Sequence, residues 1–270
     1  MYEYLRTRNT CTPKLIVVLI GMLLFGAQAQ AGSAAGGESH FRAEQISAFA
    51  KRVEKTMAAH GARVAILARV GRPVADLPDG FHYTHVAFAV YSQIKTTDGR
   101  SIPGYAIYNL YQDAGHPDHS SLVVDYPADF FAGVYALKTD ILIPTPELQR
   151  QLLRVIASDT YRKLHNPAYS VVANPYNRKF QNCTEHTLDV LNAAIYHTDD
   201  IDVIKADERA YFKAQPVKIN PLKMLAGMVT MPDLKVTDQK HGVRTASFTT
   251  IARYLRQYDL LADELVVAQQ

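Results

Sequence analysis

Residues 84–111 read THVAFAVYSQIKTTDGRSIPGYAIYNLY and carry the clearest strand signals of the chain. Segments 84–94 and 104–111 show a period of two residues, which predicts β-strands because successive side chains of a strand point to opposite faces. The dipeptide Asp98-Gly99 between them is typical of a tight turn joining antiparallel strands. The stretch therefore predicts a β-hairpin.

Helical and strand signals flank this hairpin. Apolar residues recur at helical spacing over residues 41–60, and Pro146 introduces a helix expected to run to about residue 163. Two more helices are expected over residues 183–196 and 247–258, and two more strands over residues 64–68 and 134–143. Because helices and antiparallel strands are segregated along the chain, the sequence predicts an α+β fold in a single domain, residues 41–270.

The N-terminal residues have the pattern of a secretory signal peptide. A short basic region precedes the apolar run 15–25, and two overlapping Ala-x-Ala sites end at Ala29 and Ala31. The apolar run is shorter than the roughly 20 residues that a spanning helix needs, and no second run of spanning length follows. We expect a signal peptide over residues 1–31, a linker over 32–40, export to the bacterial periplasm and no membrane span after processing. An uncleaved anchor is the alternative.

Composition excludes several classes of protein. Hydrophobic residues make up 48% and charged residues 20% of the chain, values typical of a globular protein. A formal net charge of +3 is too weak, and too scattered, to indicate a nucleic-acid partner. Of the two cysteines, Cys11 and Cys183, only Cys183 would remain after processing. A lone cysteine in an exported chain is either buried and inert or a retained reactive thiol.

Cys183 lies in the segment QNCTEH, residues 181–186, where a helix is expected to begin. The positive end of a helix dipole favours the thiolate and lowers the pKa of the thiol. A buried structural cysteine is the alternative, because an apolar stripe continues along the same helix. Glu185 and His186 are expected on the exposed side of its first turn.

His85 opens a predicted strand and is the preferred candidate for a base, since His82 should point to the opposite face. A catalytic imidazole needs an acceptor that holds its tautomer. The partner strand offers Asn109 and Gln112, which have opposite parity, so only one can share the face of His85. We favour Asn109, the polar residue among apolar neighbours.

Two further histidines, His116 and His119, are close enough in sequence to bind a metal. Pro117 and the neighbouring Gly and Ser residues favour a solvated loop instead. We therefore expect neither a metal nor another cofactor.

A strand-borne THVAFA (84–89) precedes NCTE (182–185) at a helix start, with His85 before Cys183. This order resembles the circularly permuted papain-like hydrolases, which belong with the NlpC-type cell-wall peptidases. Three further segments, residues 63–72, 108–111 and 174–176, resemble an exported bacterial family known only as a domain of unknown function.

The resemblance implies a circularly permuted papain-like fold, with an antiparallel sheet packed against the helix that starts at Cys183 and with helical additions at both ends. It implies Cys183 as the nucleophile, His85 as the base and a third polar residue, here Asn109, on the next strand. The Sγ atom of Cys183 should then lie within about 4 Å of a ring nitrogen of His85. The candidates for an oxyanion or substrate contact are Gln181, Asn182 and Gln112.

Two functions follow as expectations. The first is an exported thiol hydrolase or acyltransferase that cleaves an amide, ester or thioester bond in a peptide or acyl substrate, with peptidoglycan stem peptides as the favoured case. The second is a non-catalytic papain-like binding or assembly module of the periplasm, in which Cys183 is merely packed.

Overall fold

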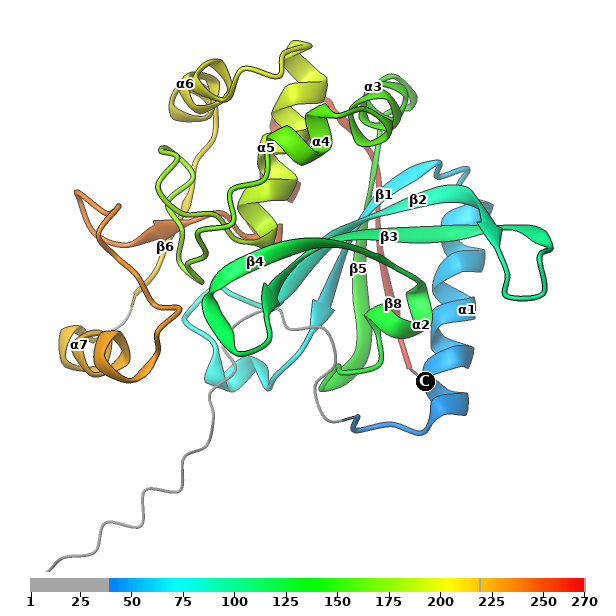
Figure 1. Ribbon diagram of the computed structural model, residues 1–270, viewed down its shortest axis with the longest axis horizontal. Helices are drawn as coiled ribbons and strands as arrows, with labels where there is room; N and C mark the ends of the chain where they lie inside the picture. The colour runs from blue at the N-terminus through cyan, green and yellow to red at the C-terminus, as the bar shows by residue number, and fades with distance from the viewer. Residues whose placement is uncertain (1–38, 219, 270) are drawn as a thin grey trace, which may run out of the picture.

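The computed structural model describes residues 39–218 and 220–269. The expected signal peptide and nearly all of the expected linker lie outside the described residues. The remaining chain forms a six-stranded antiparallel sheet in the order β4-β3-β2-β1-β5-β8, with helices on both faces (Figure 1). The strands are β1 (Val64–Val70), β2 (His85–Lys95), β3 (Ser101–Asp113), β4 (His116–Asp125), β5 (Ala136–Pro144) and β8 (Leu261–Ala268). The expected α+β class with an antiparallel sheet is confirmed.

The predicted hairpin is the pair β2–β3. Its register sets Lys95 opposite Ser101 and Phe88 opposite Tyr108. Gly99 turns the chain with a φ of 82°, a left-handed conformation that glycine adopts without steric cost.

Side-chain alternation divides the sheet into two faces, and each face has its own core. On one face, Ala87 of β2 and Ile107 of β3 pack with α1 (Ala43–Ala59) and α2 (Pro127–Phe130). On the other face, Val86 and Phe88 pack with the remaining large helices. These are α3 (Pro146–Ala157), α5 (Cys183–Tyr196) and α8 (Phe248–Gln257). A residue's parity in β2 or β3 therefore decides which set of helices it meets.

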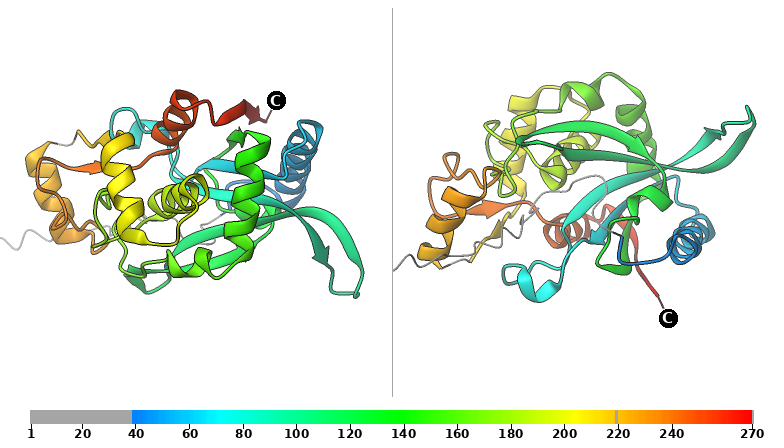
Figure 2. Two further views of the ribbon diagram at one scale, coloured as in Figure 1. Left: turned by 90° about the horizontal axis from the view of Figure 1, so that it is seen from above. Right: turned by 60° about the horizontal axis from the view of Figure 1, so that its bottom comes forward.

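Smaller elements complete the described chain. The helices α4 (Thr160–Lys163) and α6 (Ile201–Tyr211) flank α5, and a 3₁₀ turn spans Val74–Asp76. Away from the main sheet, α7 (Pro221–Thr230) lies beside a two-stranded sheet of β6 (Gln215–Pro216) and β7 (Arg244–Thr245) (Figure 2). Among the residues that the structure describes, no helix is both long enough and apolar enough to span a membrane.

Two expectations are corrected, and one strand is added. Residues 116–119, expected in a loop, open β4, because a turn at Gly115 (φ 79°) folds this segment back onto β3. The helix expected to run to residue 163 is broken at Ser158, so α4 is separate from α3. Residues after the last expected helix form the edge strand β8, which pairs with β5.

Candidate functional site

Cys183 is the first residue of α5, and Asn182 is its N-cap. The Oδ1 atom of Asn182 accepts hydrogen bonds from the backbone amides of Thr184 (3.1 Å) and Glu185 (3.0 Å). Its Nδ2 atom donates to the backbone oxygen of Val171 at 3.2 Å. The amide of Asn182 is thus used to begin the helix and to hold the preceding loop.

Gln181 is also fully engaged by the protein. Its Oε1 atom accepts from the backbone amide of Asn166 at 2.9 Å. Its Nε2 atom donates to the backbone oxygen of Leu164 (2.9 Å) and to Asp189 Oδ2 (2.7 Å). Neither Gln181 nor Asn182 therefore has a free side-chain donor for an oxyanion.

A cavity of about 300 Å³ lies beside Cys183, whose side chain forms part of its wall. Cys183 is only 5% exposed, and its Sγ atom lies 3.8 Å from Thr184 Oγ1. Thr84 and Val86, the two residues that flank His85, also line this cavity. Most of the remaining wall is apolar, and includes Leu77, Phe81, Val171, Met224, Leu234 and Phe248.

His85 lies in a different environment, which is closed to solvent. It is 1% exposed, its ring stacks on Tyr111 with centroids 4.9 Å apart, and Phe130 lies on a second side at 5.7 Å. Burial, together with the charge of Arg69, lowers the pKa of His85 well below its ordinary value. The ring is therefore neutral at pH 7.

Asn109 holds the tautomer of this ring. Its Oδ1 atom lies 2.9 Å from His85 Nε2, and its Nδ2 atom donates to Asp125 Oδ1 at 2.7 Å. Because Nδ2 serves Asp125, Oδ1 accepts, so Nε2 of His85 carries the proton. The Nδ1 atom of His85 is buried and has no hydrogen-bond partner among the residues that the structure describes.

Asp125 completes this polar cluster. It also accepts a hydrogen bond of 2.8 Å from the hydroxyl of Tyr111. Burial raises the pKa of Asp125 to about 6, although both hydrogen bonds oppose the shift. Arg69 covers the cluster with its guanidinium 5.4 Å from the ring centroid of Tyr111 and donates to the backbone oxygen of Phe130.

The sheet separates His85 from Cys183. The rings that pack on His85 belong to the face covered by α1 and α2, and Asn109 shares that face with Ile107. Cys183 packs against Leu110, which has the opposite parity, and against Tyr169. The expected contact between Sγ of Cys183 and a ring nitrogen of His85 is therefore wrong: neither of the two nitrogens has a sulfur partner among the described residues. The physical reason is alternation along β2 and β3.

Gln112 also lies away from His85. Its Nε2 atom donates to the backbone oxygen of Pro117 (2.6 Å) and to Asp233 Oδ2 (3.2 Å). It therefore ties β3 to the loop after α7, and neither bond reaches His85 or Cys183.

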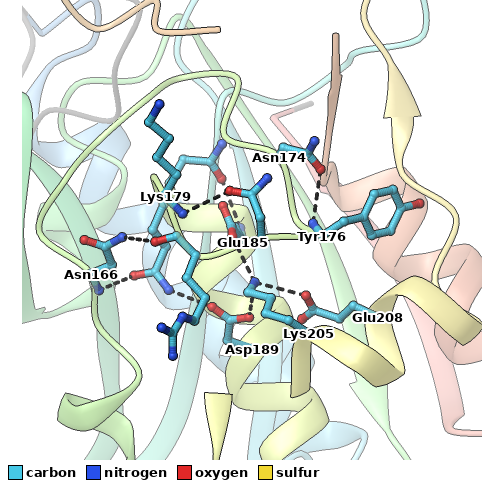
Figure 3. A network of polar contacts seen from close by, with 12 residues as sticks. Asn166, Asn174, Tyr176, Lys179, Glu185, Asp189, Lys205 and Glu208 are labelled. Carbon is cyan, nitrogen blue, oxygen red and sulfur yellow. Dashed lines mark hydrogen bonds and ion pairs between the residues drawn. The ribbon is translucent and has the colours of Figure 1, made fainter. Parts of the chain in front are cut away.

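A buried ionic network on α5 and α6 was not expected (Figure 3). Lys205 Nζ lies 2.9 Å from Glu185 Oε1, 2.6 Å from Asp189 Oδ1 and 3.0 Å from Glu208 Oε2, with all four side chains at most 3% exposed. Burial raises the pKa of Glu185 and of Glu208 well above the ordinary value, against the attraction of Lys205. Burial alone would lower the pKa of Lys205, but the three carboxyl groups raise it, so the lysine stays charged.

The exposed positions expected for Glu185 and His186 are therefore wrong. His186 is 2% exposed and lies against Tyr161 with ring centroids 4.9 Å apart. Burial lowers its pKa to about 3. The reason is that α5 is covered by α3, α6 and the sheet, so even its polar first turn is inside.

The histidines of β4 are on the surface. His119 Nδ1 lies 2.9 Å from Asp118 Oδ1, and Asp118 also pairs with Lys235. Within the part of the chain that the structure describes, no group of three or more His, Cys, Asp or Glu side chains is arranged to hold a metal ion.

Comparison with known proteins identifies a family for the chain but finds no relative of known activity. No curated protein matches the chain, and no solved structure does. One family model, described as "Uncharacterized protein conserved in bacteria (DUF2145)", matches residues 56–255. The matched region includes β1 to β5, His85, Asn109, Cys183 and the cavity wall. Since the match covers most of its length, the chain belongs to this bacterial family, whose description assigns no activity.

Proposed function

We propose that this protein binds an apolar ligand, an acyl chain or the apolar side chains of a peptide, in the cavity beside Cys183. The observation that carries the proposal is the cavity of about 300 Å³ with its mostly apolar wall. This volume is at the lower end of the range for small-molecule sites, which are mainly apolar with a few polar groups that fix orientation. Here those groups are Thr184, Thr245 and Ser247, near the start of α5.

The cellular setting of this binding module is part of the proposal. The basic region, the apolar run and the Ala-x-Ala sites of residues 1–31 favour export, and the periplasm of a bacterium would supply both lipids and cell-wall peptides. The ligand class is therefore an acyl chain or apolar peptide that is present in the cell envelope.

A cysteine hydrolase or acyltransferase is the second candidate. It is favoured by the position of Cys183, which begins α5 and lies in the cavity wall. A helix N-terminus favours the thiolate and offers amides to an oxyanion. An antiparallel sheet packed against a helix that starts at a cysteine is also what a circularly permuted papain-like fold would have.

The hydrolase is less well supported than binding because the base is misplaced. His85 is neutral, buried and on the other face of the sheet, so it has no route to the proton of the Cys183 thiol. Attack on an amide, ester or peptidoglycan bond would need another proton acceptor on the cavity side. Binding needs only the cavity.

Displacement of a fluorescent apolar probe by dodecanoate tests the proposal. Val171 is half-buried in the cavity wall, so Val171→Trp should fill the cavity and weaken dodecanoate binding by at least about tenfold. The matched control is Val203→Trp, at an exposed position (45%) on α6. Equal affinities for Val171→Trp and the unaltered chain would contradict the proposal.

A further inference from the structure

The segment around α7 presents an apolar surface to solvent. We define the α7 segment as residues 213–218 and 220–245, which comprise β6, α7, β7 and their connections and lie at one edge of the molecule (Figures 1 and 2). Met224 and Gly227 of α7 face inward and line the cavity. Val229 faces away from the cavity and is 81% exposed, the highest value among the large hydrophobic residues of the described chain, and Met228 beside it is 43% exposed.

The same segment presents positive charge. Both of its aspartates, Asp233 and Asp238, are buried, and it contains no glutamate. Among the side chains that the structure describes here, the formal charges that are exposed are all positive: Lys213, Lys218, Lys240 and Arg244.

Exposed apolar side chains on a helix, accompanied by lysine and arginine, are what a protein needs to sit at the surface of an anionic bilayer. The apolar groups enter the boundary between headgroups and acyl chains, and the cations meet the lipid phosphates. Among the side chains that the structure describes in this segment, the exposed charge is thus of one sign, which suits an anionic surface.

We propose that the outer side of α7 docks on a bilayer that contains anionic phospholipid. Since the inner side of the same helix lines the cavity, docking would bring the cavity beside the lipid, from which an acyl chain could enter without crossing open water. The docking rests on the surface of the α7 segment alone; only the source of the ligand rests on the function proposed above.

Flotation with lipid vesicles tests the docking. The chain should float with vesicles of phosphatidylethanolamine and phosphatidylglycerol and should bind neutral phosphatidylcholine vesicles several-fold more weakly, with added salt weakening the anionic case. Val229→Asp should reduce partitioning by at least about tenfold, and Lys218→Glu by about fivefold or more. All variants are prepared in the same form, so that the apolar run of residues 15–25 contributes equally to each.

Matched variants elsewhere on the surface decide the result. Val203→Asp on α6 and Lys95→Glu at the tip of the β2–β3 hairpin should bind vesicles as the unaltered chain does. Equal partitioning of Val229→Asp and Val203→Asp, or equal binding to neutral and anionic vesicles, would overturn the docking. Binding to neither vesicle would also overturn it and would leave a protein as the occupant of this surface.

The dodecanoate assay, run without vesicles, separates this proposal from the one on which it partly rests. Val229→Asp should retain dodecanoate affinity because its side chain points away from the cavity, whereas Val171→Trp should lose dodecanoate binding and keep vesicle binding. Loss of one activity with retention of the other shows which proposal has failed.

Discussion

Cys183 and His85 lie on opposite sides of the sheet, although the two residues that flank His85 line the same cavity as Cys183. Thr84 and Val86 share the cavity with Cys183, whereas His85 between them meets Tyr111 and Phe130. Any activation of the thiol must therefore come from groups on the cavity side of the sheet, such as the start of α5, and not from this imidazole.

The alkylation rate of Cys183 tests this separation. We expect His85→Ala to leave the rate of iodoacetamide labelling at pH 6 within about twofold of the unaltered chain, because no ion pair is removed. Dodecanoate should slow labelling in both proteins, because it would occupy the cavity beside the sulfur. Mass spectrometry of the labelled peptide gives the rates.

A second substitution controls for the loss of packing that His85→Ala could cause. His85→Phe retains a ring between Tyr111 and Phe130 and should also leave labelling unchanged. A labelling rate at pH 6 that falls more than about tenfold in both variants, with an unchanged circular dichroism spectrum, would show that His85 activates Cys183 and would contradict their separation.

The residues around His85 and Cys183 show how much of the site the sequence predicts. The alternation of β3 shows only that one of Asn109 and Gln112 can share the face of His85, and the apolar neighbours of Asn109 favour that residue. The structure has a 2.9 Å contact between Asn109 and His85. The same alternation cannot say which face of the sheet α5 will cover, because that depends on packing between distant segments. Because successive residues of a strand point to opposite faces, the choice of face decides whether Cys183 meets His85 or the two residues that flank it, Thr84 and Val86. The prediction that Cys183 contacts His85 rests on the wrong face.

At the scale of elements, α5 and α6 are joined by charge inside the core. Lys205 of α6 meets Glu185 and Asp189 of α5 and Glu208 of its own helix (Figure 3). One cation among three buried carboxyl groups is stable only if some of these groups are protonated, as the raised pKa values of Glu185 and Glu208 indicate.

Lys205→Met should therefore destabilise the fold in a pH-dependent way. Removal of the only ammonium group from this network leaves carboxyl groups buried without a counter-ion, a change that costs about 3–5 kcal/mol at pH 7. A buried acid with a raised pKa binds protons in the folded state that the unfolded state releases above about pH 4.3, so its stabilising contribution is lost as pH rises. The penalty of Lys205→Met should be smallest near pH 4 and should grow toward pH 7.

Urea unfolding monitored by circular dichroism at both pH values provides the measurement. Lys163→Met, which removes an exposed pair with Asp199, is the matched control and should cause no measurable change at either pH. A penalty for Lys205→Met that is small, or that is independent of pH, would show that the network contributes little to stability.

Elements with strong periodicity were predictable, whereas those with mixed polarity were not. The hairpin β2–β3 follows from two-residue alternation, and the start of α5 near Cys183 follows from the helical pattern of the residues after it. In contrast, β4 begins with His116-Pro117-Asp118, a polar run that forms a strand only because β3 supplies its partner. The ionic network had no sequence signal, since Lys205 and Glu208 look like an ordinary exposed pair three residues apart.

At the scale of the whole molecule, a buried polar cluster and a mostly apolar cavity lie on opposite faces of one sheet. The His85–Asn109–Asp125 cluster lies on the face covered by α1 and α2, and the cavity beside Cys183 lies on the other face, where α7 forms part of its wall. We assign ligand binding to the cavity, and the His85–Asn109–Asp125 cluster is a packed polar part of the core.

The most direct test of this assignment is a crystal structure of the chain bound to ω-bromododecanoic acid, read by the anomalous scattering of bromine. The account predicts a single strong peak inside the cavity, with the acyl chain in contact with Cys183, Val171 and Phe248. A peak beside His85 on the α2 face, or none within the cavity at saturating ligand, would contradict the central claim.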